Sequence, residues 1–437
     1  MGSISVFEHD VLLVGTVQKK GGFEQKHFNS LADRLGKKDD DAFPFYSLVK
    51  YQRIDGIKFK QYVGAIQVGD LTIEILPKTD KDEKKNKEED FEKNEERWRG
   101  VLLDMLRAIY NLQVRSQSNA PQHLRHSSVL DFVIYRFLDE TETLLHQGLV
   151  KTYRKLNENS TALKGKLLIL QQVTRNLVHQ EKFYVRHTMF DRSHIMNRIL
   201  RQTLVCLCNY SKNPSIYQRA KTYLTCFPEL DPVTVNENLF ARLIFDRKTT
   251  RYRDAISLAE LILINNMPDL QSGGKDTLAL LFDMNRLWEQ FVFVSIRRHL
   301  AGKYLVRDQV RHGFWETKII RPDIVVSNLY DQDDVEVILD TKWKQPAKGI
   351  PSDSDLHQMY VYFKYFGAKK VALLYPGSTQ LNSDSSDNDY TPVRGKFTDD
   401  SGASCDLFYL PVPDESKNVK LWQKQIGGAV EKWLLAH

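Results

Sequence analysis

The last third of the chain contains two short apolar segments that carry acidic residues. Segment 318–326 contains Asp323 directly after a proline, and segment 335–344 contains Asp340 followed two positions later by Lys342. Both segments are predicted to be β-strands, because they are short, apolar and rich in β-branched residues. Side chains alternate between the two faces of a strand, so Asp340 and Lys342 should lie on the same face. This arrangement places an acid beside an amine.

The polar residues 327–334 between these segments predict a hairpin connection. In that hairpin Asp323 would approach Asp340, and two adjacent carboxylates repel each other unless a cation lies between them. The natural cation is a hard divalent ion such as Mg²⁺, which is held by carboxylates and water. Lys342 would then orient or deprotonate the attacking water. The alternative is that the same residues form a turn, a strand end and a surface ion pair without any catalytic role.

A third acid interrupts an apolar helix face. Residues 276–300 are predicted to form one long amphipathic helix, in which Glu289 lies among apolar residues such as Val292. Burial of an unpaired carboxylate is costly, so Glu289 needs a cation, a proton or a set of hydrogen-bond donors. We therefore expect Glu289 to join the two aspartates as a metal ligand.

A further predicted helix carries two polar residues on one face. It covers residues 355–367, and Gln358 and Tyr362 lie four positions apart on the same side of it. A buried strand is expected at 370–375. The predicted order is a helix with Glu, a strand, a strand with Pro-Asp, a strand with Asp-x-Lys, a helix with Gln and Tyr, and a strand. This order resembles the PD-(D/E)xK nuclease fold, and the Gln-x-x-x-Tyr pair resembles its RecB-like branch.

The composition is that of a globular protein with more than one domain. The chain has 437 residues and a formal net charge of +6, which permits nucleic-acid binding without requiring it. We expect no signal peptide and no membrane-spanning segment. The cysteines have no zinc-site spacing and are typical of thiols in a reducing cytoplasm: Cys206, Cys208, Cys226 and Cys405.

The chain lacks the loop that would bind a nucleotide triphosphate. The only similar stretch, Gly273-Gly274-Lys275, has neither the preceding glycine spacing nor the Ser or Thr after the lysine of a Walker A motif. Any nucleotide-driven step must therefore come from a partner.

The patterns along the chain predict an α+β, multidomain protein. Residues 1–97 are a β-rich region with a hairpin at 59–78, and this region ends in a charged linker at 79–97, which could also be a frayed helix. Residues 98–270 are mainly helical. Residues 271–437 contain the acidic segments and form the predicted PD-(D/E)xK domain.

Four ordered sequence blocks resemble the McrC family. They lie between about residues 50 and 375 and cover most of the chain. The blocks are YVGAIQVGDLTIEILPK, GLVKTYRKLNENSTALKGKLLI, FDRSHIMNRILRQTL and LLFDMNRLWEQFV, the last followed by RPDIVV and ILDTKWK. The resemblance implies the endonuclease subunit of a McrBC-type, modification-dependent (type IV) restriction system. The sequence departs from the family at 79–97 and 377–400, where loops are lengthened.

The same resemblance implies partners. In this family a separate AAA+ GTPase, McrB, recognises methylated DNA and assembles into rings, and McrC binds the ring, stimulates GTP hydrolysis and cuts DNA. The expected partners are therefore a hexameric McrB-like GTPase, which binds the GTP, and double-stranded methylated DNA. The β-rich region and part of the helical middle would contact the ring, and the C-terminal domain would be the nuclease.

The expected site has six members with three roles. Metal binding falls to Glu289, Asp323 and Asp340, water activation to Lys342, and support of the site or the DNA backbone to Gln358 and Tyr362. Two other functions stay open. One is a non-cleaving adaptor that activates a GTPase ring, and the other is a RecB-like repair nuclease that needs no GTPase partner.

Overall fold

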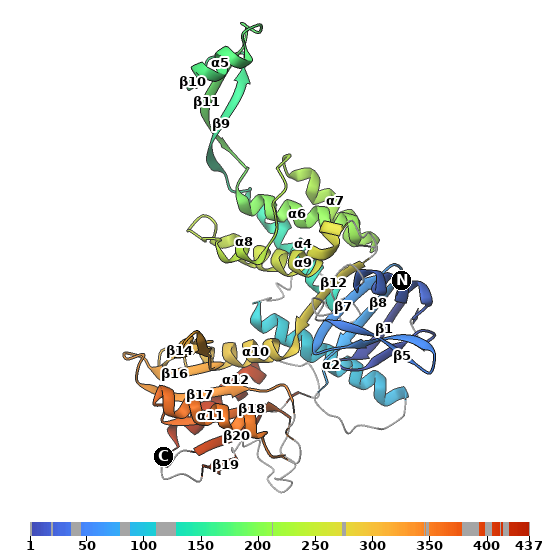
Figure 1. Ribbon diagram of the computed structural model, residues 1–437, viewed down its shortest axis with the longest axis vertical. Helices are drawn as coiled ribbons and strands as arrows, with labels where there is room; N and C mark the ends of the chain where they lie inside the picture. The colour runs from blue at the N-terminus through green and yellow to red at the C-terminus, as the bar shows by residue number, and fades with distance from the viewer. Residues whose placement is uncertain are drawn as a thin grey trace. The chain divides into compact units, whose positions relative to one another are not determined.

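The computed structural model describes residues 2–18, 21–35, 45–78, 88–110, 128–211, 213–272, 277–344, 346, 349–377, 393–397, 404–410, 412–413 and 419–436. The chain forms two compact units (Figure 1). The first comprises Met1–Val129 and Leu281–His437, and the second comprises Leu130–Leu280. Helices and several separate sheets occur together, which confirms the predicted mixture of α and β structure.

The N-terminal part of the first unit is rich in strands, as predicted. Its four-stranded sheet has the order β1-β8-β7-β12 and consists of β1 (Gly2–Phe7), β8 (Leu71–Leu76), β7 (Tyr62–Val68) and β12 (Thr277–Asp283). The hairpin expected at 59–78 is confirmed, because β7 and β8 pair in antiparallel fashion. Gly69 begins its turn with φ of +57°, a left-handed conformation that glycine adopts without a Cβ clash.

A second small sheet accompanies the first. It has the order β2-β6-β5, with β2 (Val11–Leu13), β6 (Ile54–Phe59) and β5 (Tyr46–Tyr51). Helix α1 (Gln25–Leu35) contacts β6 and β7. A short ribbon of β3 (Val17–Gln18) and β4 (Gly21–Gly22) lies beside β1.

Helix α2 (Glu88–Ile109) begins inside the segment that was predicted to be a charged linker. Of the two interpretations of this segment, the helix holds at 88–97 and the linker does not, and residues 79–87 lie outside the described part of the chain. Tertiary ion pairs explain the difference. Arg99 Nε donates to Glu74 Oε2 on β8 at 2.8 Å, and Arg99 also pairs with Glu95 on its own helix. These contacts attach the start of α2 to the sheet.

The second unit is mainly helical, in agreement with the prediction for the middle of the chain. Its helices are α4 (Val129–Gln147), α6 (Ile195–Tyr210), α7 (Pro214–Cys226), α8 (Glu237–Ala241), the 3₁₀ turn η2 (Thr250–Tyr252) and α9 (Arg253–Ser272). Helix α6 packs against α7 and α9.

A long ribbon extends from these helices. Strands β9 (Thr152–Ser160) and β11 (Phe183–Asp191) pair in antiparallel fashion along nine residues. The far end of the ribbon carries β10 (Lys166–Leu167) and α5 (Ile169–Arg175) (Figure 1). No residue of α5 is buried, so this end contributes little to the core of the unit.

A six-stranded sheet forms the C-terminal part of the first unit, in the order β13-β16-β17-β18-β20-β19. Its strands are β13 (Tyr304–Asp308), β16 (Ile324–Asn328), β17 (Val335–Thr341), β18 (Lys370–Pro376), β20 (Ser404–Leu410) and β19 (Val393–Lys396). The central strands β17, β18 and β20 are parallel, and the outer pairs are antiparallel.

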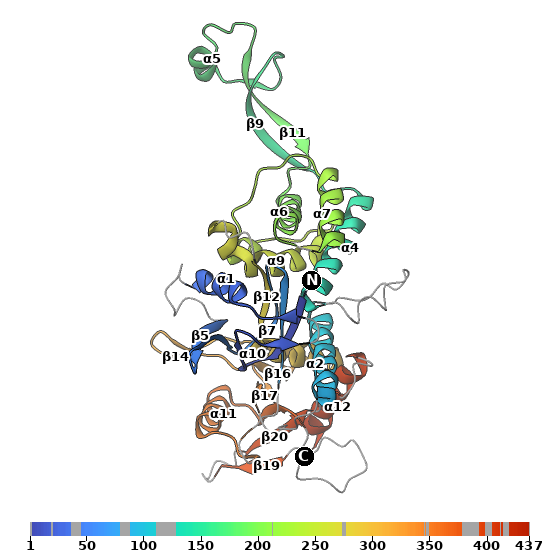
Figure 2. The same ribbon diagram turned by 90° about the vertical axis from the view of Figure 1, so that its right-hand side faces the viewer.

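Helices cover both faces of this sheet. Helix α11 (Asp353–Phe366) lies on one side and α12 (Val419–Leu435) on the other, and α10 (Met284–His299) packs against α12 (Figure 2). The core under α11 includes Val325, Ile338 and Leu373 from three neighbouring strands. Strand alternation therefore assigns Asp340, two residues after Ile338, to the α11 side.

The predicted single helix at 276–300 is wrong in its first part. Residues Thr277–Asp283 form β12, and α10 starts at Met284. The Asp283 carboxylate caps α10 by accepting hydrogen bonds from the backbone N–H groups of Asn285 and Arg286. An apolar run such as Thr277–Asp283 is compatible with a buried strand as well as with a helix. This run forms a strand because it pairs in the N-terminal sheet.

Two predicted strands are shorter than expected. The strand at 318–326 is interrupted, because β15 (Lys318–Ile320) pairs with β14 (His312–Trp315) in a separate ribbon and β16 starts only at Ile324. Pro322 lies in the gap and has no N–H to continue a ladder. Strand β17 ends at Thr341 instead of 344.

Among the described residues, no helix is both long enough and apolar enough to cross a membrane.

Candidate active site

The predicted hairpin brings the two aspartates together. Strands β16 and β17 are antiparallel, with Ile324 opposite Leu339. Asp323 directly precedes β16, and Asp340 is the next-to-last residue of β17, so both carboxylates lie at the same end of the pair. Each acid is close enough for its charge to act on the other, since the negative charge of Asp323 raises the pKa of Asp340.

Asp340 is buried in the structure, with 1% of its surface exposed. Burial raises its pKa to about 7, and the charge of Asp323 acts in the same direction. Its Oδ2 lies 2.6 Å from Lys342 Nζ, and the two side chains form an ion pair. The predicted pairing of the acid and the amine is therefore present.

Asp323 is held by donors from the neighbouring strand. Its Oδ2 accepts from the backbone N–H of Thr341 at 2.8 Å and from Thr341 Oγ1 at 2.9 Å. Burial raises the pKa of Asp323, although these two hydrogen bonds oppose that shift. The side chain is thus fixed in position while its negative charge stays poorly compensated.

Glu289 reaches the same place from α10. Gln309 Nε2 donates to Glu289 and also to Asp323 Oδ1, the latter at 3.3 Å. Burial raises the pKa of Glu289 to about 7, and the charge of Asp323 is the next largest cause. Gln309 has a φ of +48° and follows β13 directly. Its amide bridges two carboxylates that would otherwise repel each other.

Lys342 lies among three acceptors. Its Nζ is 2.6 Å from Asp340, 3.6 Å from Asp355 Oδ1 and 3.2 Å from Gln358 Oε1. Burial lowers the pKa of Lys342, but the carboxylates of Asp340 and Asp355 outweigh burial and the net shift is upward. The ammonium group is therefore charged at neutral pH.

Helix α11 supplies the remaining predicted residues. Ser352 caps this helix by accepting from the backbone N–H of Asp355 at 3.3 Å. Gln358 Nε2 donates to Tyr362 OH at 2.8 Å, and Tyr362 OH donates to the carbonyl oxygen of Arg321 at 3.1 Å. Because Gln358 and Tyr362 are four residues apart on one helix face, they complete a chain of hydrogen bonds. The chain runs from Lys342 to Arg321 in the loop before β16.

All six predicted residues belong to one connected cluster, and the sequence interpretation missed three members. These are Gln309, Thr341 and Asp355, which orient the acids or pair with Lys342. Asp355 was recognisable in principle, because it lies three positions before Gln358 and shares its helix face. Gln309 and Thr341 act through contacts between strands, for which the local sequence gives no signal.

The cluster does not form a ready-made cage of three ligands. Within the described ranges, no group of three or more His, Cys, Asp or Glu side chains could hold a metal ion as placed. Asp323 and Glu289 are turned toward the Gln309 amide between them. The predicted ligand set of three carboxylates stays a prediction.

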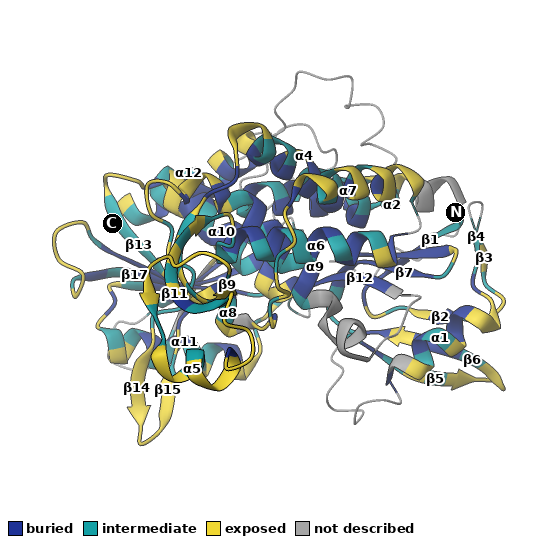
Figure 3. Cartoon of the chain, turned by 90° about the horizontal axis from the view of Figure 1, so that it is seen from above, coloured by how far each residue is buried: buried dark blue, intermediate teal, exposed yellow. Residues whose placement is uncertain are grey.

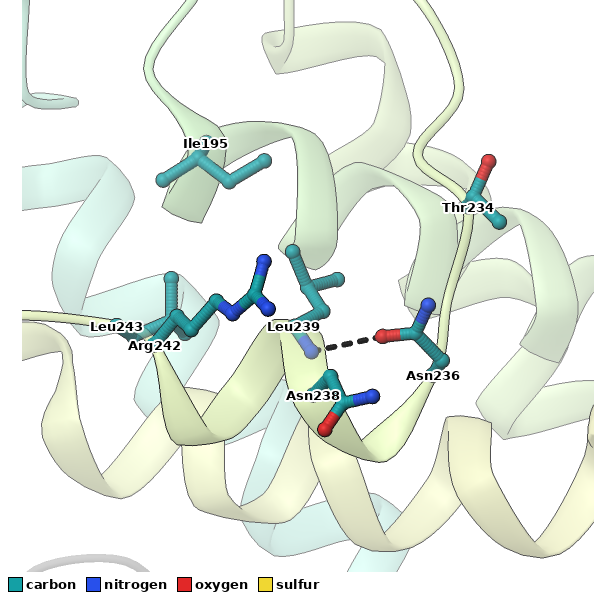
Figure 4. A pocket seen from close by; sticks show the side chains of 7 residues that line it. All are labelled: Ile195, Thr234, Asn236, Asn238, Leu239, Arg242 and Leu243. Carbon is teal, nitrogen blue, oxygen red and sulfur yellow. Dashed lines mark hydrogen bonds between the residues drawn. The ribbon is translucent and has the colours of Figure 1, made fainter.

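A pocket in the second unit has fewer charged side chains than the acidic cluster. It has a volume of about 470 Å³ and is lined by Ile195, Thr234, Asn236, Asn238, Leu239, Arg242 and Leu243 (Figure 4). The Asn236 side-chain oxygen is already used, because it accepts from the backbone N–H of Leu239 at the start of α8. Among the lining side chains that the structure describes, Arg242 is the charged one, and none is a carboxylate, a histidine or a cysteine.

The fold and the cluster define a multidomain α+β protein with an Asp, Asp-x-Lys and Glu site on a mixed sheet. The sequence profile of the family described as "McrBC 5-methylcytosine restriction system component" matches residues 57–376, which is most of the chain. The chain belongs to this family, as the sequence blocks implied.

The chain also resembles individual members of this system. It is 22% identical over 213 residues to the type IV methyl-directed restriction enzyme EcoKMcrBC of Escherichia coli K12, and the match covers 48% of this chain and 60% of that protein. The match thus spans about three-fifths of the relative's length. A solved assembly of Thermococcus gammatolerans McrB AAA+ hexamers with bound McrC contains a chain with the same fold, at 18% identity and a TM-score of 0.64. That alignment covers 99% of this chain and 100% of the other.

Proposed function

We propose that this protein is the Mg²⁺-dependent DNA endonuclease subunit of a McrBC-type restriction complex, with a PD-(D/E)xK nuclease domain. Family membership supports the restriction system. The observation that carries the nuclease assignment is the contact of Lys342 Nζ with Asp340 at 2.6 Å, beside Asp323 on the paired strand. A structural ion pair does not need two further, partly buried acids whose charges repel each other.

The residues present suit a hard divalent cation. The pKa values of Glu289 and Asp340 are raised to about 7, first by burial and then by the negative charge of Asp323. Mg²⁺ is commonly held by one or two carboxylates, with water and phosphate oxygens as its other ligands. Asp323 and Asp340 would supply these carboxylates, and Glu289 would bind through water or after release from Gln309. When bound, Mg²⁺ polarises the scissile phosphate and lowers the pKa of a bound water.

Lys342 would act in the reaction as a cation. Because its pKa is raised, it donates hydrogen bonds to the attacking water or to the phosphate oxygens instead of removing a proton. Gln358 fixes the position of the ammonium group, and Tyr362 fixes the amide of Gln358. The positive charge then stabilises the negative charge that develops on the phosphate in the transition state.

The proposed partner is a McrB-like AAA+ GTPase, and the proposed substrate is methylated double-stranded DNA. The structural relative from Thermococcus gammatolerans is an McrC bound to McrB hexamers, and its fold matches this chain along nearly the full length. A GTPase partner would supply the nucleotide-driven step for which the sequence has no Walker A loop.

The test is cleavage of methylated and unmethylated plasmid with Mg²⁺, with and without the GTPase partner and GTP. We expect cutting only when methylation, partner and GTP are all present. Cutting by the isolated chain would favour the RecB-like repair nuclease. Stimulated GTP hydrolysis without any cutting would favour the adaptor.

A pair of variants separates catalysis from folding. Asp340→Ala should abolish cutting while partner binding and GTPase stimulation stay intact. Asp334→Ala is the matched control, because Asp334 directly precedes the same strand and its carboxylate pairs with Lys369 and accepts from Asn328 Nδ2, neither of which belongs to the cluster. Parallel loss of cutting, partner binding and GTPase stimulation in Asp340→Ala would indicate a folding defect and contradict the assignment.

A further inference from the structure

A second pocket lies directly beside the proposed catalytic cluster. It has a volume of about 630 Å³ and is lined by Arg311, Phe314, Ile319, Ile320, Arg321, His357, Gln358, Val361 and Tyr362. This volume is within the range of small-molecule sites, roughly 300–1,000 Å³. Gln358 and Tyr362 form the shared wall, because Gln358 also accepts a hydrogen bond from Lys342. A ligand in the pocket would therefore lie one side chain away from Lys342.

The opposite wall is the β14–β15 ribbon, which extends into solvent and is exposed along most of its length (Figure 3). The ribbon is fixed to α11 by Tyr365, whose hydroxyl donates to the carbonyl oxygen of Gly313. The ring of Phe314 also meets the ring of Tyr365 edge to face, with 5.7 Å between centroids. The pocket is thus bounded by two elements that contact each other in the structure.

The lining combines cations with an exposed aromatic ring. Arg311 and Arg321 are exposed and form no ion pair in the part of the chain that the structure describes. The charge of Arg321 acts to lower the pKa of Glu289 and Asp323, which places its guanidinium within electrostatic reach of the acids. Phe314 and Ile319 are 49% and 58% exposed, and they contribute apolar surface. Positive charge beside an aromatic face is the chemistry that binds a nucleotide, through its phosphate and its base.

We propose that this pocket binds the nucleotide next to the scissile phosphate of the DNA. Its base packs against Phe314 and Ile319, and its phosphate binds Arg311 and Arg321. The proposal rests on the nuclease function proposed above and adds a substrate-positioning site to it. It gives the β14–β15 ribbon the role of holding the DNA strand at the correct distance from Lys342.

The ribbon provides matched control residues. Phe314 and Trp315 are adjacent on β14, and of these two only Phe314 lines the pocket. Trp315 is 63% exposed, so both variants remove an exposed aromatic ring. Arg311, which directly precedes β14, lines the pocket, whereas Lys318, the first residue of β15, carries the same charge and does not line it.

The experiment uses the full chain with the proposed GTPase partner and a short methylated duplex whose cutting position has been mapped. A 2-aminopurine base is placed beside the cut, and binding is followed by its fluorescence in the non-cutting Asp340→Ala background. We expect the base to leave the duplex stack on binding and its fluorescence to rise, Phe314→Ala to reduce that rise and weaken binding about tenfold, and Trp315→Ala to leave both unchanged. Arg311→Ala should reduce the slope of log affinity against log salt by about one, and Lys318→Ala should not.

Two failures can be told apart. If the chain without substitutions cuts the duplex, but Phe314→Ala and Trp315→Ala in the Asp340→Ala background bind it equally well and change its fluorescence equally, the pocket proposal is overturned and the nuclease function stands. If the unmodified chain with partner and GTP neither binds nor cuts the duplex, the proposed function itself fails and the pocket proposal fails with it.

Discussion

Lys342 determines which chemistry the acidic cluster can perform. Its ammonium group contacts Asp340, Asp355 and Gln358, and two of these contacts are with carboxylates. A lysine surrounded in this way keeps its proton at neutral pH, which is consistent with its raised pKa. The residue therefore serves as an electrostatic group, and the position of its Nζ controls how well it meets developing charge.

The hydroxyl of Tyr362 should matter through that position. Tyr362→Phe removes the acceptor for Gln358 Nε2, so the amide loses its fixed orientation. We expect kcat for DNA cleavage to fall about tenfold, roughly 1.4 kcal/mol, with KM nearly unchanged. Tyr409→Phe is the control, since its hydroxyl donates only to Gly349 O, outside the cluster. Equal kcat values for both variants would show that the hydrogen-bond chain has no effect on Lys342.

The acids predict a pH dependence of metal binding. The pKa values of Glu289 and Asp340 are raised to about 7, so protons occupy these groups below that pH and compete with the cation. Affinity for Mg²⁺ should be full at pH 8 and should fall as pH drops through 7, by about tenfold per pH unit for each proton displaced. Calorimetric titration with Mg²⁺ at pH 6, 7 and 8 measures this. Affinity that is independent of pH would contradict the metal assignment of these carboxylates.

At the scale of elements, a buried contact joins the N-terminal sheet to the end of β17. Glu8 directly follows β1 and is 3% exposed. Its Oε1 accepts from Trp343 Nε1 at 2.7 Å and from the backbone N–H of Lys78 at 2.9 Å. Trp343 follows Lys342 and packs against Trp288, with 5.3 Å between ring centroids, next to Glu289. The β-rich region, which is predicted to contact the GTPase, is thus bonded to Trp343. Trp343 is next to Lys342 in the sequence and packs against Trp288, which precedes Glu289.

The hydrogen bond from Trp343 to Glu8 should affect the rate of DNA cleavage directly, in addition to its effect on the stability of the fold. Trp343→Phe removes the indole N–H and leaves the buried Glu8 carboxylate short of a donor, which costs about 1–3 kcal/mol. Trp433→Phe removes a comparable bond in the same unit, from Trp433 Nε1 to Asp406 Oδ2 at 2.6 Å. We expect both variants to lower the melting temperature, and only Trp343→Phe to lower the cutting rate. Similar cutting rates in the two variants would show that the contact between Glu8 and Trp343 has only a structural role.

At the scale of the whole molecule, the two compact units should respond separately to local damage. Tyr252 is fully buried in the second unit, where its hydroxyl donates to Asn197 Oδ1 at 2.9 Å and accepts from the backbone N–H of Val150 at 2.8 Å. Tyr252→Phe leaves both partners unsatisfied and should destabilise the second unit by about 1–3 kcal/mol.

Hydrogen exchange followed by mass spectrometry can show which unit loses stability in Tyr252→Phe. Protection should fall within Leu130–Leu280 and stay unchanged in the six-stranded sheet of the first unit. Trp433→Phe should give the reverse pattern. If either variant lowered protection in both units equally, the chain would unfold as one cooperative body.

The sequence by itself determined the chemical content of the candidate site. Asp340 and Lys342 meet because strand alternation is a local rule, and Gln358 and Tyr362 meet because helical spacing is another. The hairpin between β16 and β17 followed from a polar loop between two apolar strands. These relations depend on residues close together in the chain, so a single sequence contains them.

The tertiary structure decided what depends on distant partners. Residues Thr277–Asp283 became a strand because the N-terminal sheet offered an edge, and an apolar run alone does not choose between strand and helix. Gln309 bridges carboxylates that come from two other elements, and Glu8 binds Trp343, which is 335 positions away. Such contacts have no periodic signature, because hydrogen bonds between distant side chains depend on where the fold places the elements that carry them.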